Sequence, residues 1–152
     1  MEKSKNLDEY SRKHHSMNIN VDELIYSIIE ELSKFIEKKE IQVSISSKKG
    51  LVACLNEEKI RPIIRSLLMN TIDITSKSGF VGIYCYLEYS KLLFCVESLN
   101  SSPNSRKYDN AKIKIIKMLI KEMRGNIWIS KSSIYNKRVF FYFEITKMDT
   151  SD

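Results

Sequence analysis

The stretch that decides the fold is Asn-Glu-Glu-Lys-Ile-Arg-Pro-Ile-Ile-Arg-Ser-Leu-Leu-Met-Asn-Thr-Ile-Asp-Ile-Thr-Ser-Lys, residues 56–77. Asn56 is a favourable N-cap, and Glu57 and Glu58 follow it where the helix dipole favours negative charge. Asn70 lies just off the apolar face, at the edge where a helix meets a pocket, although a solvated Asn would fit the same position. The apolar residues recur at steps of three and four, which predicts one buried helix face: Ile60, Ile63, Ile64, Leu67, Leu68 and Ile72.

Residues 66–75 resemble the Asn-containing helix (the N box) of the histidine kinase-type ATP-binding fold. They read Ser66-Leu67-Leu68-Met69-Asn70-Thr71-Ile72-Asp73-Ile74-Thr75. This GHKL (Bergerat) fold is shared with gyrase and MutL proteins. In the family the helix faces ATP, and its last Asn holds the magnesium ion that bridges the phosphates. The resemblance therefore implies that Asn70 would hold magnesium and that Ser66, at the family's earlier Asn, would lie beside the nucleotide.

Length and composition indicate one globular domain: 152 residues, 43% of them hydrophobic and 29% charged. No window approaches 18 consecutive apolar residues, and the N-terminal residues lack the apolar core of a secretory signal. We therefore expect a cytoplasmic protein without a membrane partner. Cys54, Cys85 and Cys95 have no metal-ligand spacing, and their odd number argues against a disulfide framework, so we expect free, buried thiols.

The periodicities predict a helix over residues 21–40, strands over 41–45 and 51–55, and the Asn70 helix ending at Ser78-Gly79. Next we expect a hairpin over 80–89 and 92–97, followed by a helix over 111–124 that Gly125 stops. The last predicted elements are strands over 126–130 and 137–146. This order predicts an α+β two-layer sandwich, with a mixed, mostly antiparallel sheet of five to six strands and three helices on one face. The domain should span residues 20–147, between tails at 1–19 and 148–152.

The same order of elements resembles the histidine kinase ATP-binding fold over residues 20–147. Arg124-Gly125-Asn126-Ile127-Trp128-Ile129 resembles the family's Gly-Gly-x-Ile-x-Val strand entry, and Val21-Asp22-Glu23-Leu24-Ile25 resembles its first helix. His14 and His15 precede this domain. We interpret both as part of a solvated linker rather than as a phosphoacceptor or a metal ligand, because no further ligands cluster beside them.

The family's nucleotide motifs are absent. Its Asp-x-Gly-x-Gly pattern, whose Asp reads adenine, falls on Ser98-Leu99-Asn100-Ser101-Ser102, so Ser98 stands where the Asp belongs. Glu97 is one residue away and strand alternation should place it on the opposite face, unless a slipped register rescues it. The phosphate-binding Gly-x-Gly turn falls on Asn110-Ala111-Lys112-Ile113 without a glycine, and residues 103–109 are short for the family's mobile lid. Lys112 could still attract an anion.

A basic stripe follows on the third predicted helix, formed by Lys114, Lys117, Lys121 and Arg124. The net charge of +6 is compatible with an acidic protein, an anionic surface or nucleic acid, and a basic stripe is often only a solvated face. No nucleic-acid-reading motif accompanies it, so we expect a protein partner: a response-regulator receiver domain or the dimerisation helices of a histidine kinase.

Three interpretations remain open. The favoured one is a degenerate histidine kinase-like domain that acts in phosphosignalling through protein contact, with little or no ATP binding and no catalytic residues. The second is a divergent ATP-dependent protein histidine kinase module, in which Asn70, Ser66, Ser98, Glu97 and Lys112 would surround Mg-ATP. The third is a basic nucleic-acid-binding domain.

Overall fold

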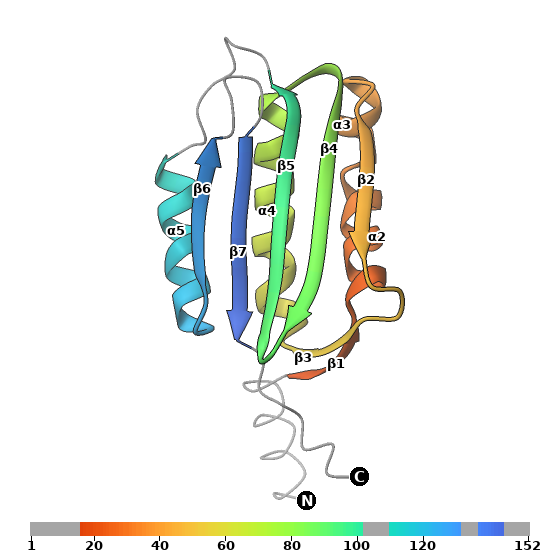
Figure 1. The fold of residues 1–152 in the computed structure, drawn as a ribbon. Helices are drawn as coiled ribbons and strands as arrows, with labels where there is room; N and C mark the ends of the chain where they lie inside the picture. Colours follow the sequence, from red (N-terminus) through yellow and green to blue (C-terminus); the bar gives the residue numbers. More distant parts are fainter. Residues whose placement is uncertain (1–15, 102–109, 132–136, 145–152) are drawn as a thin grey trace, which may run out of the picture.

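The computed structural model of the protein describes residues 16–101, 110–131 and 137–144. Its main feature is a five-stranded sheet in the order β2-β4-β5-β7-β6, and all helices lie on one face of this sheet (Figure 1). The strands are β2 (Gln42–Ser47), β4 (Thr75–Glu88), β5 (Lys91–Ser101), β6 (Asn126–Lys131) and β7 (Lys137–Glu144). The helices are α2 (Val21–Glu31), α3 (Ser33–Lys38), α4 (Glu57–Ile74) and α5 (Asn110–Glu122).

The sheet is mixed, as predicted. β2 pairs with β4 in parallel, and the pairs β4–β5, β5–β7 and β6–β7 are antiparallel. A separate two-stranded antiparallel sheet joins β1 (Met17–Asn20) to β3 (Val52–Leu55). The two-layer α+β prediction is thus confirmed, but the strand at β1 was not predicted, because it lies at the end of a polar segment. Within the described part of the chain, no helix is long and apolar enough to cross a membrane.

The hydrophobic core fills the space between the sheet and the helices. Alternate residues of each strand face this core, and the largest of them are Phe94, Phe141 and Phe143. The rings of Phe94 and Phe141 stack with their centroids 4.9 Å apart, and Phe143 meets both edge-on. The helix side of the sheet is therefore a dry, aromatic-rich layer against which α4 packs.

Helix α4 runs through the centre of the helix layer, and its predicted apolar face is buried as expected. Asn56 caps it, since its side chain accepts a hydrogen bond from the Lys59 amide at 3.4 Å. The predicted end at Ser78-Gly79 is wrong: the helix ends at Ile74 and β4 begins at once. A β-bulge lies between Thr75 and Phe80, and Ser78 within it adopts a φ of +64°.

A lysine closes the C-terminal end of α4. The Lys39 ammonium donates to the carbonyls of Ile72 at 2.9 Å, Asp73 at 2.8 Å and Thr75 at 3.2 Å. The Ile72 carbonyl also accepts from the Thr75 amide, and the cation adds a donor to all three carbonyls and complements the helix dipole. This contact ties the segment after α3 to the start of β4.

Two further boundaries differ from the predictions. The helix predicted over residues 21–40 is two helices, because the chain leaves the helical path at Leu32, with a ψ of 5°. Helix α5 ends at Glu122 and the left-handed residue is Arg124, with a φ of +56°, rather than Gly125. Gly125 is needed for another reason: a Cβ there would collide with the carbonyl of Tyr142 on β7.

Candidate functional site

A cavity of about 330 Å³ lies where α4 meets α5, and it brings together three of the residues that the resemblance singled out. Ser66 and Asn70 line it from α4, and Lys112 lines it from α5. Asn70 is only 8% exposed, and its Nδ2 is buried without a hydrogen-bond partner among the described residues. A buried amide donor left unpaired costs free energy, so this group favours an oxygen ligand in the cavity.

The rest of the cavity wall is basic and apolar. Arg61 and Arg65 line it beside Lys112, together with Pro62 and Met69. The two arginines also hold α4 against α2, because Arg61 Nη1 lies 2.5 Å from one Glu31 oxygen and Arg65 Nε lies 3.2 Å from the other. Arg61 also lies 3.3 Å from Glu57, so the carboxylates of Glu31 and Glu57 offset the two arginines and Lys112 leaves the wall with a small positive surplus. The cavity therefore suits the phosphate end of a ligand better than a metal ion.

Ser98, which stands at the family's adenine-reading position, does not line this cavity. It faces the helix layer, is fully buried, and its hydroxyl lies 2.6 Å from that of Thr75. The Thr75 hydroxyl also donates to the Thr71 carbonyl at 2.6 Å, one turn earlier. The two hydroxyls thus satisfy each other inside the core.

Glu97 faces the opposite side of the sheet, as strand alternation predicted, so no slipped register brings it to the helix layer. Its carboxylate accepts hydrogen bonds from the Tyr84 hydroxyl at 2.6 Å and from Arg138 Nε at 2.8 Å. Gly82 leaves room for it, because a Cβ there would lie 3.2 Å from the Glu97 side chain. The hydrogen bond to Glu97, assisted by burial, raises the pKa of Tyr84 above its usual 10.0.

The described residues do not fit the Mg-ATP site that the fold family implies. The position for the adenine carboxylate holds a buried serine already paired with a threonine. The start of α5, where the family has its glycine turn, reads Asn110-Ala111. No group of three or more His, Cys, Asp or Glu side chains in residues 16–101, 110–131 and 137–144 could hold a metal ion. Only the anion-compatible cavity beside Asn70 matches the family's arrangement.

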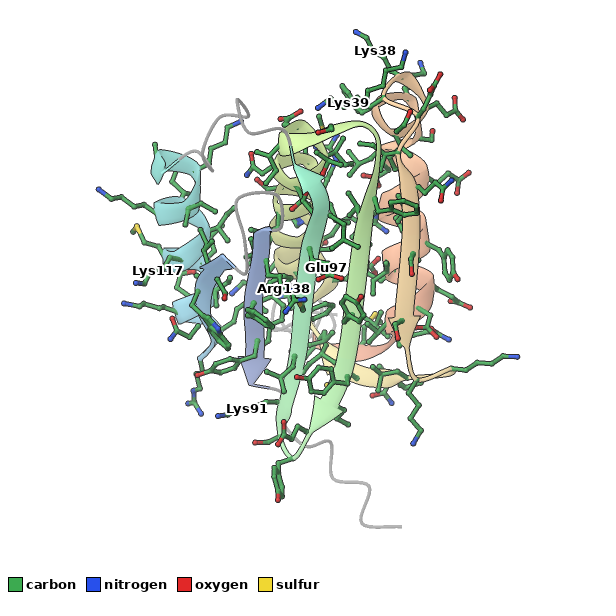
Figure 2. The ribbon with its side chains drawn as sticks, turned by 45° about the horizontal axis from the view of Figure 1, so that its top comes forward. Lys38, Lys39, Lys91, Glu97, Lys117 and Arg138 are labelled. Carbon is green, nitrogen blue, oxygen red and sulfur yellow. The ribbon has the colours of Figure 1, made fainter. Side chains whose placement is uncertain are left out.

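The basic stripe predicted on the third helix lies on α5 and in the turn after it. Lys114, Lys117 and Lys121 are exposed, on the side of α5 away from its buried residues, and Arg124 is exposed after the helix end. Figure 2 shows Lys117 extending outward from α5. Sequence reasoning missed that Ile115 and Met118 are also exposed there, by 59% and 67%. The outer side of α5 is therefore both cationic and apolar.

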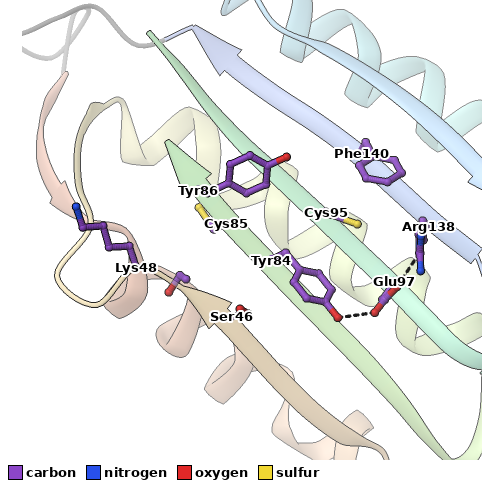
Figure 3. A pocket seen from close by; sticks show the side chains of 10 residues that line it. Ser46, Lys48, Tyr84, Cys85, Tyr86, Cys95, Glu97, Arg138 and Phe140 are labelled. Carbon is purple, nitrogen blue, oxygen red and sulfur yellow. Dashed lines mark hydrogen bonds and ion pairs between the residues drawn. The ribbon is translucent and has the colours of Figure 1, made fainter. Parts of the chain in front are cut away.

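The open face of the sheet holds a second hollow, of about 460 Å³, that sequence reasoning did not predict. Tyr84 and Tyr86 from β4 line it together with Arg138 and Phe140 from β7 (Figure 3). The alternation of aromatic residues along 80–86 was the available signal, but it does not reveal that residues 138 and 140 lie beside them.

Comparisons with known proteins agree on the fold. No protein-family model and no curated protein sequence matches the chain. Among solved structures, a nucleotide-free catalytic domain of histidine kinase ThkA matches with a TM-score of 0.74 and 18% identity, over 85% of this chain and 95% of that one. Acinetobacter baumannii histidine kinase AdeS matches with a TM-score of 0.74 and 9% identity, over 86% of this chain and 68% of that one. The chain thus has the fold of histidine kinase catalytic domains.

ThkA was also solved in complex with the response regulator protein TrrA. That structure matches 95% of this chain and 49% of the ThkA chain, with a TM-score of 0.73 and 17% identity.

Proposed function

We propose that this chain acts in two-component-type phosphosignalling through protein contact, with little or no ATP binding. The fold it shares with histidine kinase catalytic domains supports the signalling setting. The observation that carries the loss of nucleotide chemistry is Ser98. Its buried hydroxyl is already paired with Thr75, and the neighbouring carboxylate, Glu97, is held on the opposite face by Arg138. Neither Ser98 nor Glu97 therefore presents a carboxylate to a base on the helix side of the sheet.

The outer side of α5 is the proposed contact surface. Its lysines at 114, 117 and 121 would meet an acidic partner, and the exposed Ile115 and Met118 would bury apolar area in the contact. A receiver domain or the dimerisation helices of a histidine kinase are the proposed partners. The complex of ThkA with TrrA supports a response regulator as the first to test.

Thermal unfolding with and without millimolar Mg-ATP tests the nucleotide half of this proposal. A ligand that binds only the folded state stabilises it by about 2.7 kcal/mol at a hundredfold excess over Kd. We expect no shift in Tm, whereas a histidine kinase catalytic domain that retains its glycine motifs should shift as a positive control. A shift of several degrees that disappears in Asn70→Ala would refute the proposal.

Binding of a receiver domain tests the contact surface. Replacing Lys114, Lys117 and Lys121 together by Gln should slow association and weaken its dependence on salt, because rim charges act mainly through steering. Gln at the exposed Lys34 and Lys38 of α3, which lies at the far side of the helix layer, is the matched control. Equal effects of the two sets would contradict the assignment to α5.

One observation favours a second candidate, a divergent ATP-binding module. Asn70, whose Nδ2 has no hydrogen-bond partner among the described residues, lines a cavity with Lys112, Arg61 and Arg65, and the small positive surplus of this wall suits a phosphate group. The Mg-ATP unfolding experiment separates the two candidates. An ATP-binding module would be stabilised by Mg-ATP, and Asn70→Ala would lose that stabilisation.

A further inference from the structure

The side of the sheet that faces away from the helices carries two adjacent rows of aromatic side chains. The strand register places Tyr84, Phe140 and Trp128 in one row across β4, β7 and β6. Tyr86 and Tyr142 stand in the next row along the same strands. No described helix or strand covers this face, and the helices all lie behind it (Figure 1). We call these five residues the aromatic face.

These rings are open to solvent. Tyr86 is 50% exposed, Trp128 is 44% exposed and Tyr84 is 39% exposed. Trp128 stacks on Phe140 with their ring centroids 5.6 Å apart. Phe140 covers one face of the Trp128 ring and leaves the opposite face of that ring uncovered by Phe140. Rows two residues apart along a strand are separated by about 6.8 Å, a spacing that lets one planar group lie on each row.

Cations border the aromatic face. Arg138 lies in the row before Tyr84, and Lys48 lines the hollow from beyond the end of β2 (Figure 3). Lys91 lies at the hairpin end, with its Nζ 4.8 Å from the centroid of the Tyr142 ring. The buried carboxylate among these rings, Glu97, is neutralised by Arg138. At the hairpin end, Glu88 of β4 and Glu144 of β7 are the register partners of Lys91.

Planar rings bordered by cations match the chemistry of an unpaired nucleic-acid strand. Bases stack on aromatic side chains whatever their sequence, and a β-sheet whose aromatic residues point outward is a known platform for two or three bases. The hollow of about 460 Å³ beside Tyr84 and Tyr86 offers room for a base, and Lys48 lines the same hollow for a phosphate, whereas the charge of Arg138 is already offset by Glu97. Tyr, Trp and Arg are also enriched at protein–protein interfaces, so the experiment has to separate nucleic acid from a second copy of the chain.

We propose that the aromatic face binds single-stranded nucleic acid, with bases stacked on Tyr84, Tyr86 and Trp128 and the phosphates near Lys48 and Lys91. The basic net charge of +6 favours this polyanionic ligand. The proposed face is on the opposite side of the sheet from the Asn70 cavity, so it does not depend on the function proposed above.

The experiment uses the full chain and fluorescein-labelled 12-nucleotide DNA and RNA strands of mixed sequence. Binding is measured by anisotropy, and also by quenching of Trp128, which is the protein's only tryptophan and therefore reports directly on this face. Two phosphate contacts predict that affinity falls roughly sevenfold between 50 and 200 mM salt. A duplex of the same sequence should bind more weakly, because its bases are paired and stacked on each other.

Two variants of one residue locate the contact. Tyr86→Ala should weaken binding about fivefold or more, because a base stacked on an aromatic ring contributes about 1–3 kcal/mol. Tyr86→Phe keeps the ring and should bind like the wild type. Tyr26→Ala, which removes a 61% exposed tyrosine from α2 in the helix layer, is the matched control and should change nothing.

The proposal is overturned if neither strand binds at 50 mM salt, or if Tyr86→Ala and Tyr26→Ala behave alike. It is also overturned if binding is lost on replacing the α5 lysines while Tyr86→Ala retains it, which would place nucleic acid on α5. A concentration-dependent dimer that buries Trp128 and is disrupted by Tyr86→Ala would identify the face as a contact between two copies instead.

Discussion

Replacing Ser98 by aspartate would place a carboxylate where the histidine kinase fold usually carries one, and its cost follows from the structure. Ser98 is fully buried, and within residues 16–101, 110–131 and 137–144 its side chain hydrogen-bonds the neutral Thr75 hydroxyl. Burial without a cation raises the pKa of a carboxyl group by about 3 units or more. Each unit corresponds to about 1.4 kcal/mol, so Ser98→Asp should lower the free energy of unfolding by about 4 kcal/mol at pH 7.

The sign and pH window of this effect are specific. Below pH 4 the new carboxyl group is protonated in both the folded and the unfolded chain, so the charge costs nothing. Between about pH 4 and pH 7 the unfolded chain loses its proton while the folded chain retains it. The stability of Ser98→Asp should therefore fall by about 1.4 kcal/mol per pH unit across this window, relative to the wild type.

Urea unfolding followed by Trp128 fluorescence between pH 4 and pH 8 measures this slope. Ser98→Asn is the matched control, because asparagine has nearly the same size as aspartate but no charge, and its cost should not vary with pH. The reasoning would be refuted if the Asp and Asn variants were equally stable at every pH. Mg-ATP protection gained by Ser98→Asp would likewise show that position 98 faces an open base pocket.

Three other predictions concern single side chains. Lys39→Met should lower the free energy of unfolding by about 2 kcal/mol, because three carbonyls at the end of α4 lose a charged donor. The exposed Lys38→Met is its control in urea unfolding, and equal losses would contradict the capping role. The raised pKa of Tyr84 means that the wild type keeps its full stability below pH 10 and loses some as pH rises through that pKa. In unfolding between pH 8 and 11, Tyr84→Phe should lack this loss, and parallel curves would argue against it. Burial raises the pKa of the Cys85 thiol to about 12, so at pH 8 it should react with Ellman's reagent far more slowly than half-buried Cys54. Similar rates in the native protein would show that Cys85 is accessible.

The sequence was informative wherever a signal is local. Three such features depend only on residues close by in the sequence, and all appear in the structure. They are the apolar spacing of α4, the Asn56 cap, and the alternation of side chains along β4 and β5. Element ends were predicted less well for a physical reason. The end of α4 at Ile74 coincides with a β4 bulge that forms against β5 and with the contact from Lys39, and both partners come from distant segments of the chain.

The candidate site divides in the same way. Local pattern placed Asn70 and Ser66 on one helix and put Glu97 and Ser98 on opposite faces, because side chains alternate along a strand. Only tertiary structure decided that Asn70 is buried with an unpaired amide, since that depends on how α5 packs against α4. Tertiary structure alone also assembled the aromatic face, because Tyr84, Phe140 and Trp128 become neighbours only through the register of β4, β5, β7 and β6. Strand register between segments far apart in the chain is fixed by packing of the whole sheet, which no single stretch of sequence specifies.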